Sequence, residues 1–190
     1  MKNRSKSLSW FSIITRGVLV GICAGSLAYW YQNRSQDSIL DFNPERDTAF
    51  ILDSFKRDWY WLVEGDDYSP EYLLKYKASS QKPEHIGNVT IKVGYHDKKP
   101  VGFVVYFMKN FYLGDLRFID LNPEFRSQGW AYKLLDYAVK DLIKRGAVKI
   151  ELVTRTTNFS AQKLYTRYGF RESSRDGGFV YFEYLVPSKS

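Results

Sequence analysis

Residues 121–132 read LNPEFRSQGWAY, and this stretch decides the fold that we expect. An apolar run ends at Leu121, Pro123 turns the chain, and a short polar loop leads into a helical pattern at Gly129. The first N–H groups of a helix lack partners within it, and the helix dipole adds positive charge there. Gly129 can adopt a backbone geometry that other residues avoid and lets a ligand approach closely. The stretch therefore predicts a strand, a loop and a helix start that binds pyrophosphate, with the charge of Arg126 beside it.

Taken alone, the same stretch also fits an ordinary turn and helix cap. It is not a Walker loop, because no Gly-Lys-Ser/Thr follows, and it is not the GxGxxG dinucleotide fingerprint.

The surrounding sequence alternates between strand and helix patterns. Residues 129–145 carry apolar side chains at helical spacing, and Gly146 ends that pattern. Asp47 is the expected cap of an earlier helix that ends near Val63. The full expectation is helices at 47–63, 70–77, 129–145 and 158–168, and strands at 38–42, 86–96, 100–108, 112–121, 148–154, 170–173 and 179–186. This order predicts a mixed α/β (α+β) sheet in which antiparallel hairpins precede a parallel β-α-β crossover.

Two motifs in this frame resemble the GNAT superfamily of acyl-CoA-dependent N-acetyltransferases. Residues 126–131 (RSQGWA) match its R/Q-x-x-G-x-G/A motif, and residues 158–170 (NFSAQKLYTRYGF) are similar to its N-x-x-A-x-x-L-Y-x-x-x-G-F signature. Residues 100–106 resemble its third strand, so the resemblance covers roughly residues 39–186. It implies a mostly antiparallel sheet with a V-shaped split between the fourth and fifth strands. It also implies direct transfer of an acetyl group from acetyl-CoA to a primary amine, without a metal.

The resemblance further implies roles for individual residues. Tyr165 matches the general acid that protonates the departing thiolate, although its apolar face also fits simple core packing. Asn158 matches the position that meets the coenzyme arm. The implied coenzyme-binding set is Ile119 and Leu121 for the pantetheine arm, and Arg126, Ser127, Gln128, Gly129, Trp130, Ala131 and Tyr132 for the pyrophosphate.

A base should also lie near the split, because an amine with a pKa near 10 is mostly protonated at neutral pH. Asp115 matches a strand position where other members carry a catalytic Glu, but it also fits a solvated residue at the strand's start. Asp120, Glu151 and a bound water are alternatives. Val153 stands where some members carry a Glu.

In this family the first two helices, their loop and the last hairpin set the acceptor. Acidic and aromatic residues there suit a cationic amine, but they also fit an amphipathic helix with core aromatics and solvated acids. They are Asp58, Trp59, Tyr60, Trp61, Glu64, Asp66, Asp67 and Tyr68. A small amine, an amino sugar and a protein amino group all remain open as acceptors.

The basic surplus is concentrated in one segment. Of the 28 Lys and Arg residues, five lie among residues 1–35 without an acid, so the rest of the chain carries 23 basic against 21 acidic side chains. Nucleic-acid binding is therefore not expected, because its basic footprint should extend over the folded domain. A single cysteine, Cys23, excludes an intrachain disulfide framework, and a His-rich metal centre is not expected from two histidines.

Residues 1–36 are expected to form a segment separate from the acetyltransferase-like domain at 37–190. Residues 8–31 contain one charge, Arg16, and fit a membrane anchor, a secretory signal cleaved near Ala28, or an ordinary packed helix. The basic start favours an N-in orientation, which would put the domain on the side where acetyl-CoA is not expected. A membrane-attached, catalytically inactive binding module is therefore the rival hypothesis.

Overall fold

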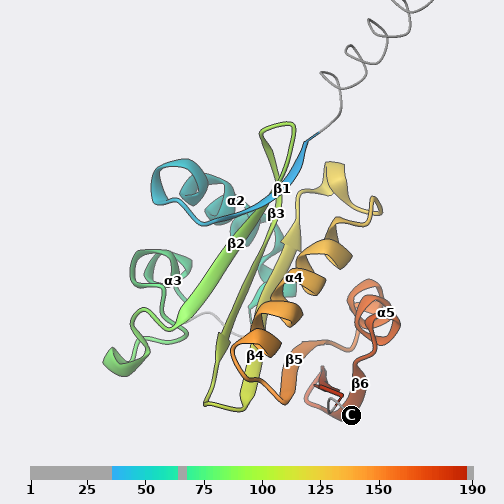
Figure 1. Ribbon diagram of the computed structural model, residues 1–190. Helices are drawn as coiled ribbons and strands as arrows, with labels where there is room; N and C mark the ends of the chain where they lie inside the picture. The colour runs from blue at the N-terminus through green and yellow to red at the C-terminus, as the bar shows by residue number, and fades with distance from the viewer. Residues whose placement is uncertain (1–35, 64–67, 188–190) are drawn as a thin grey trace, which may run out of the picture. The chain divides into compact units, whose positions relative to one another are not determined.

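A seven-stranded sheet runs through residues 36–63 and 68–187, the part of the chain that the computed structural model describes. The strand order is β1-β2-β3-β4-β5-β7-β6 (Figure 1), and every neighbouring pair is antiparallel except β4 and β5. The strands are β1 (Asp37–Asp41), β2 (Val89–His96), β3 (Lys99–Met108), β4 (Leu113–Leu121), β5 (Lys149–Arg155), β6 (Arg171–Asp176) and β7 (Phe179–Leu185). The predicted mixed sheet with a parallel β-α-β core is confirmed.

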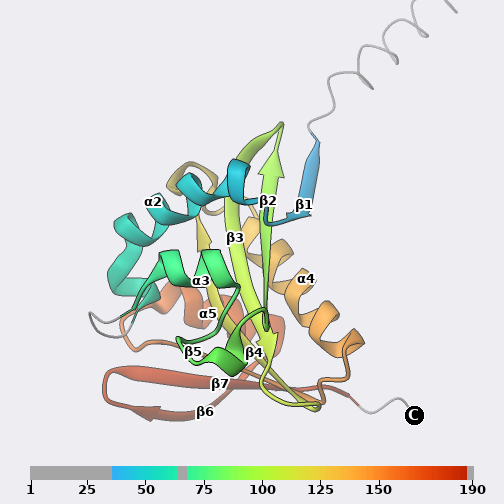
Figure 2. The same ribbon diagram turned by 90° about the vertical axis from the view of Figure 1, so that its left-hand side faces the viewer.

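Helices cover both faces of this sheet (Figure 2). On one face α2 (Pro44–Leu62) and α3 (Pro70–Tyr76) pack on β2, β3 and β4, with Ile51 and Phe55 fully buried between them. On the other face α4 (Trp130–Lys144) and α5 (Phe159–Tyr168) enclose a second core. Short 3-10 turns at Pro83–His85 and Pro123–Phe125 complete the described elements. Each helix buries one stripe, as the helical spacing of its apolar residues predicts.

The β2–β3 and β6–β7 connections are tight hairpins. Asp97 and Lys98 both have positive φ, at 47° and 68°, and Gly177 and Gly178 do the same in the other turn. Two consecutive positive φ angles give a turn whose twist matches that of the flanking strands. The β2–β3 hairpin agrees with the antiparallel hairpins predicted before the crossover.

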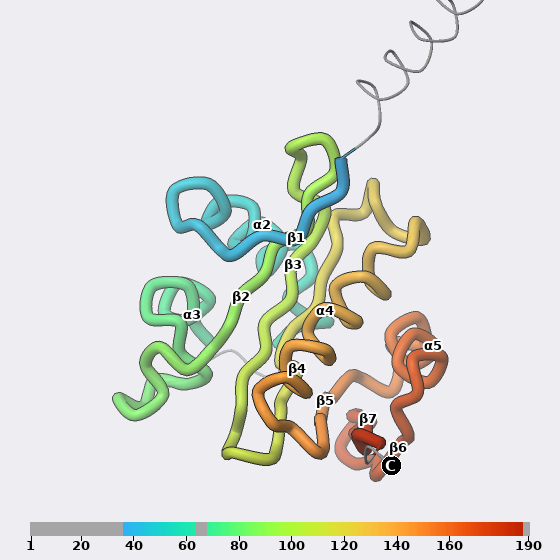
Figure 3. The backbone as a smooth tube through the Cα atoms, viewed as in Figure 1, coloured from blue at the N-terminus to red at the C-terminus, as the bar shows by residue number. Residues whose placement is uncertain are grey.

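The parallel pair β4–β5 is short, and this creates a split in the sheet. Its paired positions are Leu113 with Lys149, Gly114 with Ile150, and Asp115 with Glu151. Beyond them β4 continues to Leu121 and β5 to Arg155 without pairing with each other, and Figure 3 traces the two strands as they part. A bulge in β4 leaves Arg117 unmatched in the register with β3, and a bulge bends and twists its strand. The V-shaped split predicted between the fourth and fifth strands is present.

The start of α2 differs from the prediction. Asn43, not Asp47, is the N-cap: its side chain accepts hydrogen bonds from the N–H groups of Glu45 and Arg46, and Pro44 takes the first helical position. An Asn-Pro pair suits these two positions, because Asn caps well and Pro needs no N–H partner there. Asp47 lies inside the helix, where its fully buried carboxylate accepts from Tyr95, Arg46 and the Asn43 N–H.

The predicted N-terminal segment, residues 1–36, lies outside the described residues except for Gln36. Among the helices of the described part, none combines the length and apolar character needed to cross a membrane.

Candidate functional site

The loop between β4 and α4 presents backbone N–H groups at the open end of the split. Ser127 and Gly129 have positive φ, at 63° and 84°. A Cβ on Gly129 would meet nothing within 4 Å, so the position requires glycine for its backbone angle rather than for space. No side chain caps α4, and Lys133 is the residue whose N–H reaches the Gly129 carbonyl. The first-turn amides before Lys133 are therefore left for a ligand.

The side chains of the other predicted loop residues, Gln128 and residues 130–132, make contacts within the protein. Gln128 donates from its side-chain amide to the Glu124 carbonyl at 2.8 Å. Trp130 is buried in the core, Ala131 is half-buried, and Tyr132 lies exposed with its ring 5.3 Å from that of Tyr168. These residues can therefore contribute backbone amides to an anion site.

Ile119 and Leu121 direct their backbone groups into the split. Gly102 pairs with Leu121 and Val104 with Ile119, while the Asn122 N–H donates to the Val101 carbonyl. In an antiparallel ladder, hydrogen-bonded and non-hydrogen-bonded pairs alternate. Because Asn122 and Val101 form a hydrogen-bonded pair, the Leu121 and Ile119 pairs are non-hydrogen-bonded. Their amide and carbonyl groups therefore point away from β3, toward the side that β5 has left.

Arg126 lies in a charged cluster at the same end of β4. Its Nη2 is 2.8 Å from Asp58 of α2 and 3.6 Å from Asp120, and its Nε donates to the Leu121 carbonyl at 3.3 Å. Arg57 completes the cluster at 2.7 Å from Asp58 and 2.9 Å from Asp120. The sequence predicted Arg126 beside the loop but not its carboxylate partner on α2. The available signal was Asp58 itself, a charged residue on the apolar stripe that contains Ile51, Phe55 and Leu62.

Asp120 has a perturbed ionisation in this cluster. Its side chain is 10% exposed, and burial together with the nearby negative charge of Asp58 raises its pKa to about 6, against the opposing effect of Arg57. A carboxyl group that titrates near neutrality is a candidate for proton transfer. No group of three or more His, Cys, Asp or Glu side chains that would suit a metal ion occurs among the described residues.

Asp115 lies at the closed end of the split, on the last pair that joins β4 and β5. It is buried, and its carboxylate contacts Lys109 at 2.8 Å and Arg117 at 3.6 Å. Glu151, its partner across the parallel pair, is bound by Lys149 at 2.7 Å and by Lys109. Asp115 is therefore not a solvated turn residue, and two cations already pair with it.

Tyr165 and Asn158 come from the helix that follows β5. Asn158 is the N-cap of α5, and its side-chain oxygen accepts from the Ala161 N–H at 3.2 Å. Tyr165 is buried among Phe170 and Phe182, and burial raises the pKa of its hydroxyl well above the ordinary value. None of the described residues makes a hydrogen bond with that hydroxyl, and no fully buried side-chain polar atom among them lacks a partner. The Tyr165 hydroxyl is therefore free of competing bonds from the described residues, while the residue as a whole is only 4% exposed.

The predicted acceptor residues divide into packed and exposed members. Trp59 and Tyr68 pack against the α2 core, whereas Tyr60 is 54% and Trp61 44% exposed. Arg155, which the sequence did not single out, lies with its guanidinium 4.1 Å from the centre of the Tyr60 ring and donates to backbone carbonyls at the end of α2. Glu64, Asp66 and Asp67 lie outside the described residues.

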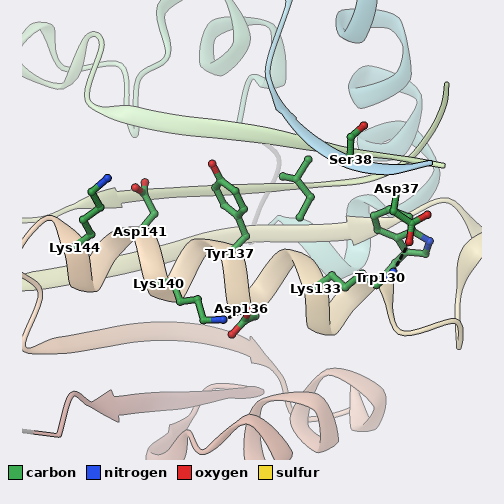
Figure 4. A pocket seen from close by; sticks show the side chains of 10 residues that line it. Asp37, Ser38, Trp130, Lys133, Asp136, Tyr137, Lys140, Asp141 and Lys144 are labelled. Atoms are coloured by element: carbon green, nitrogen blue, oxygen red, sulfur yellow. Dashed lines mark hydrogen bonds and ion pairs between the residues drawn. The ribbon is translucent and has the colours of Figure 1, made fainter. Parts of the chain in front are cut away.

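A separate groove of about 710 Å³ lies between β1 and α4. Figure 4 shows Trp130, Tyr137 and Asp141 pointing from α4 toward the strands, while Asp136 and Lys140 lie lower on the helix. Of the predicted site residues, its lining contains Trp130 alone.

Comparisons with known proteins agree with this geometry. Residues 48–170 match the model of the acetyltransferase (GNAT) family. A PaiA N-acetyltransferase from Thermoplasma acidophilum, solved with coenzyme A, is 21% identical with a TM-score of 0.64 and covers 80% of this chain and 99% of its own. The ribosomal-protein-S18-alanine N-acetyltransferase from Escherichia coli is 16% identical with a TM-score of 0.62 (82% and 97% covered). A GNAT acetyltransferase from Elizabethkingia anophelis with acetyl-CoA bound is 14% identical with a TM-score of 0.57 (79% and 98% covered). The family match spans well over half of the chain, which therefore belongs to the acetyltransferase (GNAT) family.

Proposed function

We propose that this protein transfers an acetyl group from acetyl-CoA to a primary amine. The observation that carries the proposal is the split between β4 and β5, which opens beside the uncapped start of α4. An extended chain fits beside the free edge of β4, and its phosphates fit the amides that follow Gly129. The neighbours solved with coenzyme A and acetyl-CoA support the same ligand.

Each group of residues has a part in this reaction. The amides of residues 127–132 bind the pyrophosphate, and the backbone groups of Ile119 and Leu121 align the extended arm. Acetyl-CoA supplies the thioester as acyl donor. As the amine nitrogen bonds to the acyl carbon and the C–S bond breaks, the Tyr165 hydroxyl donates its proton to the sulfur. Its raised pKa keeps this hydroxyl protonated at neutral pH.

The base that deprotonates the amine is Asp115 or Asp120. Burial and the charge of Asp58 raise the pKa of Asp120 to about 6, which suits a base, and Asp115 lies between two cations. Separate Asp115→Asn and Asp120→Asn variants distinguish them in a pH–rate profile. The variant that lacks the base loses the acidic limb of kcat/KM, and the other keeps it.

Calorimetric titration of acetyl-CoA and coenzyme A into the full chain tests the binding site. We expect micromolar binding that is lost in Gly129→Glu. Gly87→Glu is the matched control, because Gly87 also has positive φ and open space at its Cβ but lies in the loop before β2. Failure of the folded wild type to bind contradicts the proposal. Binding without turnover across an amine screen supports the inactive-module alternative.

The acceptor class and the membrane attachment remain proposals. Exposed Tyr60 and Trp61 suit a cationic amine, which stacks favourably on aromatic faces. A screen of polyamines, amino sugars and peptide N-termini with Trp61→Ala alongside tests this assignment.

For residues 1–36, membrane co-sedimentation of the full chain against a chain that starts at Asp37 tests the anchor.

A further inference from the structure

The charged cluster at the end of β4 connects two parts of the molecule that the proposed function uses separately. Arg126 belongs to the loop that binds the coenzyme, and Asp58 belongs to α2, whose last turn carries the acceptor-side residues Tyr60 and Trp61. The Arg126 Nη2 to Asp58 Oδ2 distance of 2.8 Å joins them directly.

Asp58 lies at a kink within α2, and two arginines pair with its carboxylate. Its φ of −111° and ψ of 24° are not helical and mark a kink inside the helix. A buried carboxylate is costly unless cations or donors pair with it, and the same Oδ2 of Asp58 accepts from both Arg57 and Arg126. The geometry of this part of α2 therefore depends in part on where the Arg126 guanidinium lies.

Burial does not confine the Arg126 side chain to this cluster, since it is 47% exposed. Its Nε contacts the carbonyl of Leu121, a residue whose backbone faces the split. The guanidinium therefore lies against the β4 edge that the coenzyme arm would follow. Guanidinium groups bind phosphate oxygens in the same forked geometry as carboxylates, so a diphosphate at the loop competes with Asp58 for Arg126.

We propose that the Asp58–Arg126 ion pair is a latch between α2 and the coenzyme loop, which coenzyme A opens by taking Arg126 for its diphosphate. This inference rests on the proposed function. Asp58 is a positioning residue in this scheme, because it acts through Arg126. Release of Arg126 loosens the last turn of α2, so that the acceptor side adjusts only after the coenzyme is bound. Binding at the two sites is then coupled, and the coupling is reciprocal.

Calorimetric titration of coenzyme A into the full chain tests the latch with four variants. Asp58→Asn should bind about fivefold to tenfold more tightly than wild type, because Arg126 loses its nearer competing carboxylate and keeps only the contact with Asp120 at 3.6 Å. Asp53→Asn, an exposed aspartate on the same helix, should match wild type. In an Arg126→Gln background the Asp58→Asn change should have no effect, because there is no guanidinium to release. Unchanged or weaker binding by folded Asp58→Asn, or the same gain without Arg126, overturns the latch.

Hydrogen exchange on the wild-type chain provides a second measurement that needs no variant. Coenzyme A should protect the amides of residues 127–132 and increase exchange at residues 57–63. Protection of both segments, or no change at 57–63, contradicts the latch while leaving the proposed function intact. Failure of the wild type to bind coenzyme A removes the proposed function and the latch together.

Discussion

Tyr165 and Tyr106 are buried tyrosines that differ in what their hydroxyls contact. The Tyr106 hydroxyl donates to Asp141 at 2.8 Å, whereas none of the described residues bonds with the Tyr165 hydroxyl. Burial raises the pKa of both hydroxyls. Tyr106 is therefore a suitable comparison for Tyr165, the general acid of the proposed reaction.

Replacing each tyrosine by phenylalanine should affect different properties. Tyr165→Phe should lower kcat about 100-fold with little loss of stability, because a general acid contributes on that order and no internal bond is broken. Tyr106→Phe should keep kcat and lose about 1–2 kcal/mol of unfolding free energy, because Asp141 loses a donor. Steady-state kinetics and urea unfolding measure both. A Tyr165→Phe enzyme with a full rate rules out the assigned role.

The raised pKa of Asp120 predicts that the stability of the protein depends on pH. Its folded pKa of about 6 lies above the unfolded value, first because of burial and then because of Asp58. Between about pH 4 and pH 6 the folded state holds a proton that the unfolded state has released, so wild type loses stability as pH rises through this window. Relative to Asp120→Asn, we expect the wild type to lose about 2 kcal/mol between pH 4 and pH 7.5. Urea unfolding at both pH values measures this difference. The opposite slope would show that the pairing with Arg57 outweighs burial.

At the scale of elements, the start of α2 shows how a local signal can be misread. Asp47 was the predicted cap, whereas the fold shows that Asn43 caps α2 and that Asp47 is buried against Tyr95 of β2. Burial opposes its ionisation, but the bonds from Arg46, the Asn43 N–H and Tyr95 together hold the pKa of Asp47 below its usual value.

Alanine substitutions at Asn43 and Asp47 should lower the unfolding free energy by different amounts. Asn43→Ala removes an N-cap and should lower the unfolding free energy by about 1 kcal/mol. Asp47→Ala should lower it by about 3 kcal/mol, because it leaves buried donors unpaired. Asp53→Ala, on the exposed face of α2, should change little. Equal losses at positions 43 and 47 would show that the buried network contributes no more than the cap.

At the scale of the whole molecule, the sheet consists of two parts joined at the short β4–β5 pair. On the α4 face one hydrophobic core spans both parts, with Leu116 of β4 and Leu152 of β5 in the same cluster. On the opposite face Arg155 connects the end of β5 to α2 through the carbonyls of Tyr60 and Val63, and its guanidinium also lies 5.0 Å from the centre of the Phe179 ring.

Removing the Arg155 contacts should weaken the packing between the end of β5 and the end of α2, on one side of the split. Arg155→Met keeps the length of the side chain but loses its donors, so we expect about 1–2 kcal/mol lower unfolding free energy and faster hydrogen exchange at the end of α2. Arg155→Lys should be intermediate, because it keeps the charge without the fork. Coenzyme A affinity should stay near wild type in both. Unaltered exchange in Arg155→Met would show that α2 is held without this bridge.

The sequence by itself determined the features that depend on neighbouring residues. The order of strands and helices, the antiparallel hairpins before the crossover and the loop at Gly129 follow from local periodicity and turn chemistry, because those signals act within a few residues. The mixed sheet was predicted from the order of the elements and the V-shaped split from the resemblance to the GNAT motifs, and both are confirmed.

Only the tertiary structure decided what distant residues do to one another. Asp58 meets Arg126 across 68 positions of sequence, Arg155 reaches the end of α2 across more than 90, and the bulge at Arg117 bends β4 as the strands part. Charge and burial at such points depend on which elements pack together. A single sequence can show a charged residue on an apolar stripe, as at Asp58, but not which partner it meets, so the ionisation of Asp120 and the pairing of Arg126 appear only once the chain is folded.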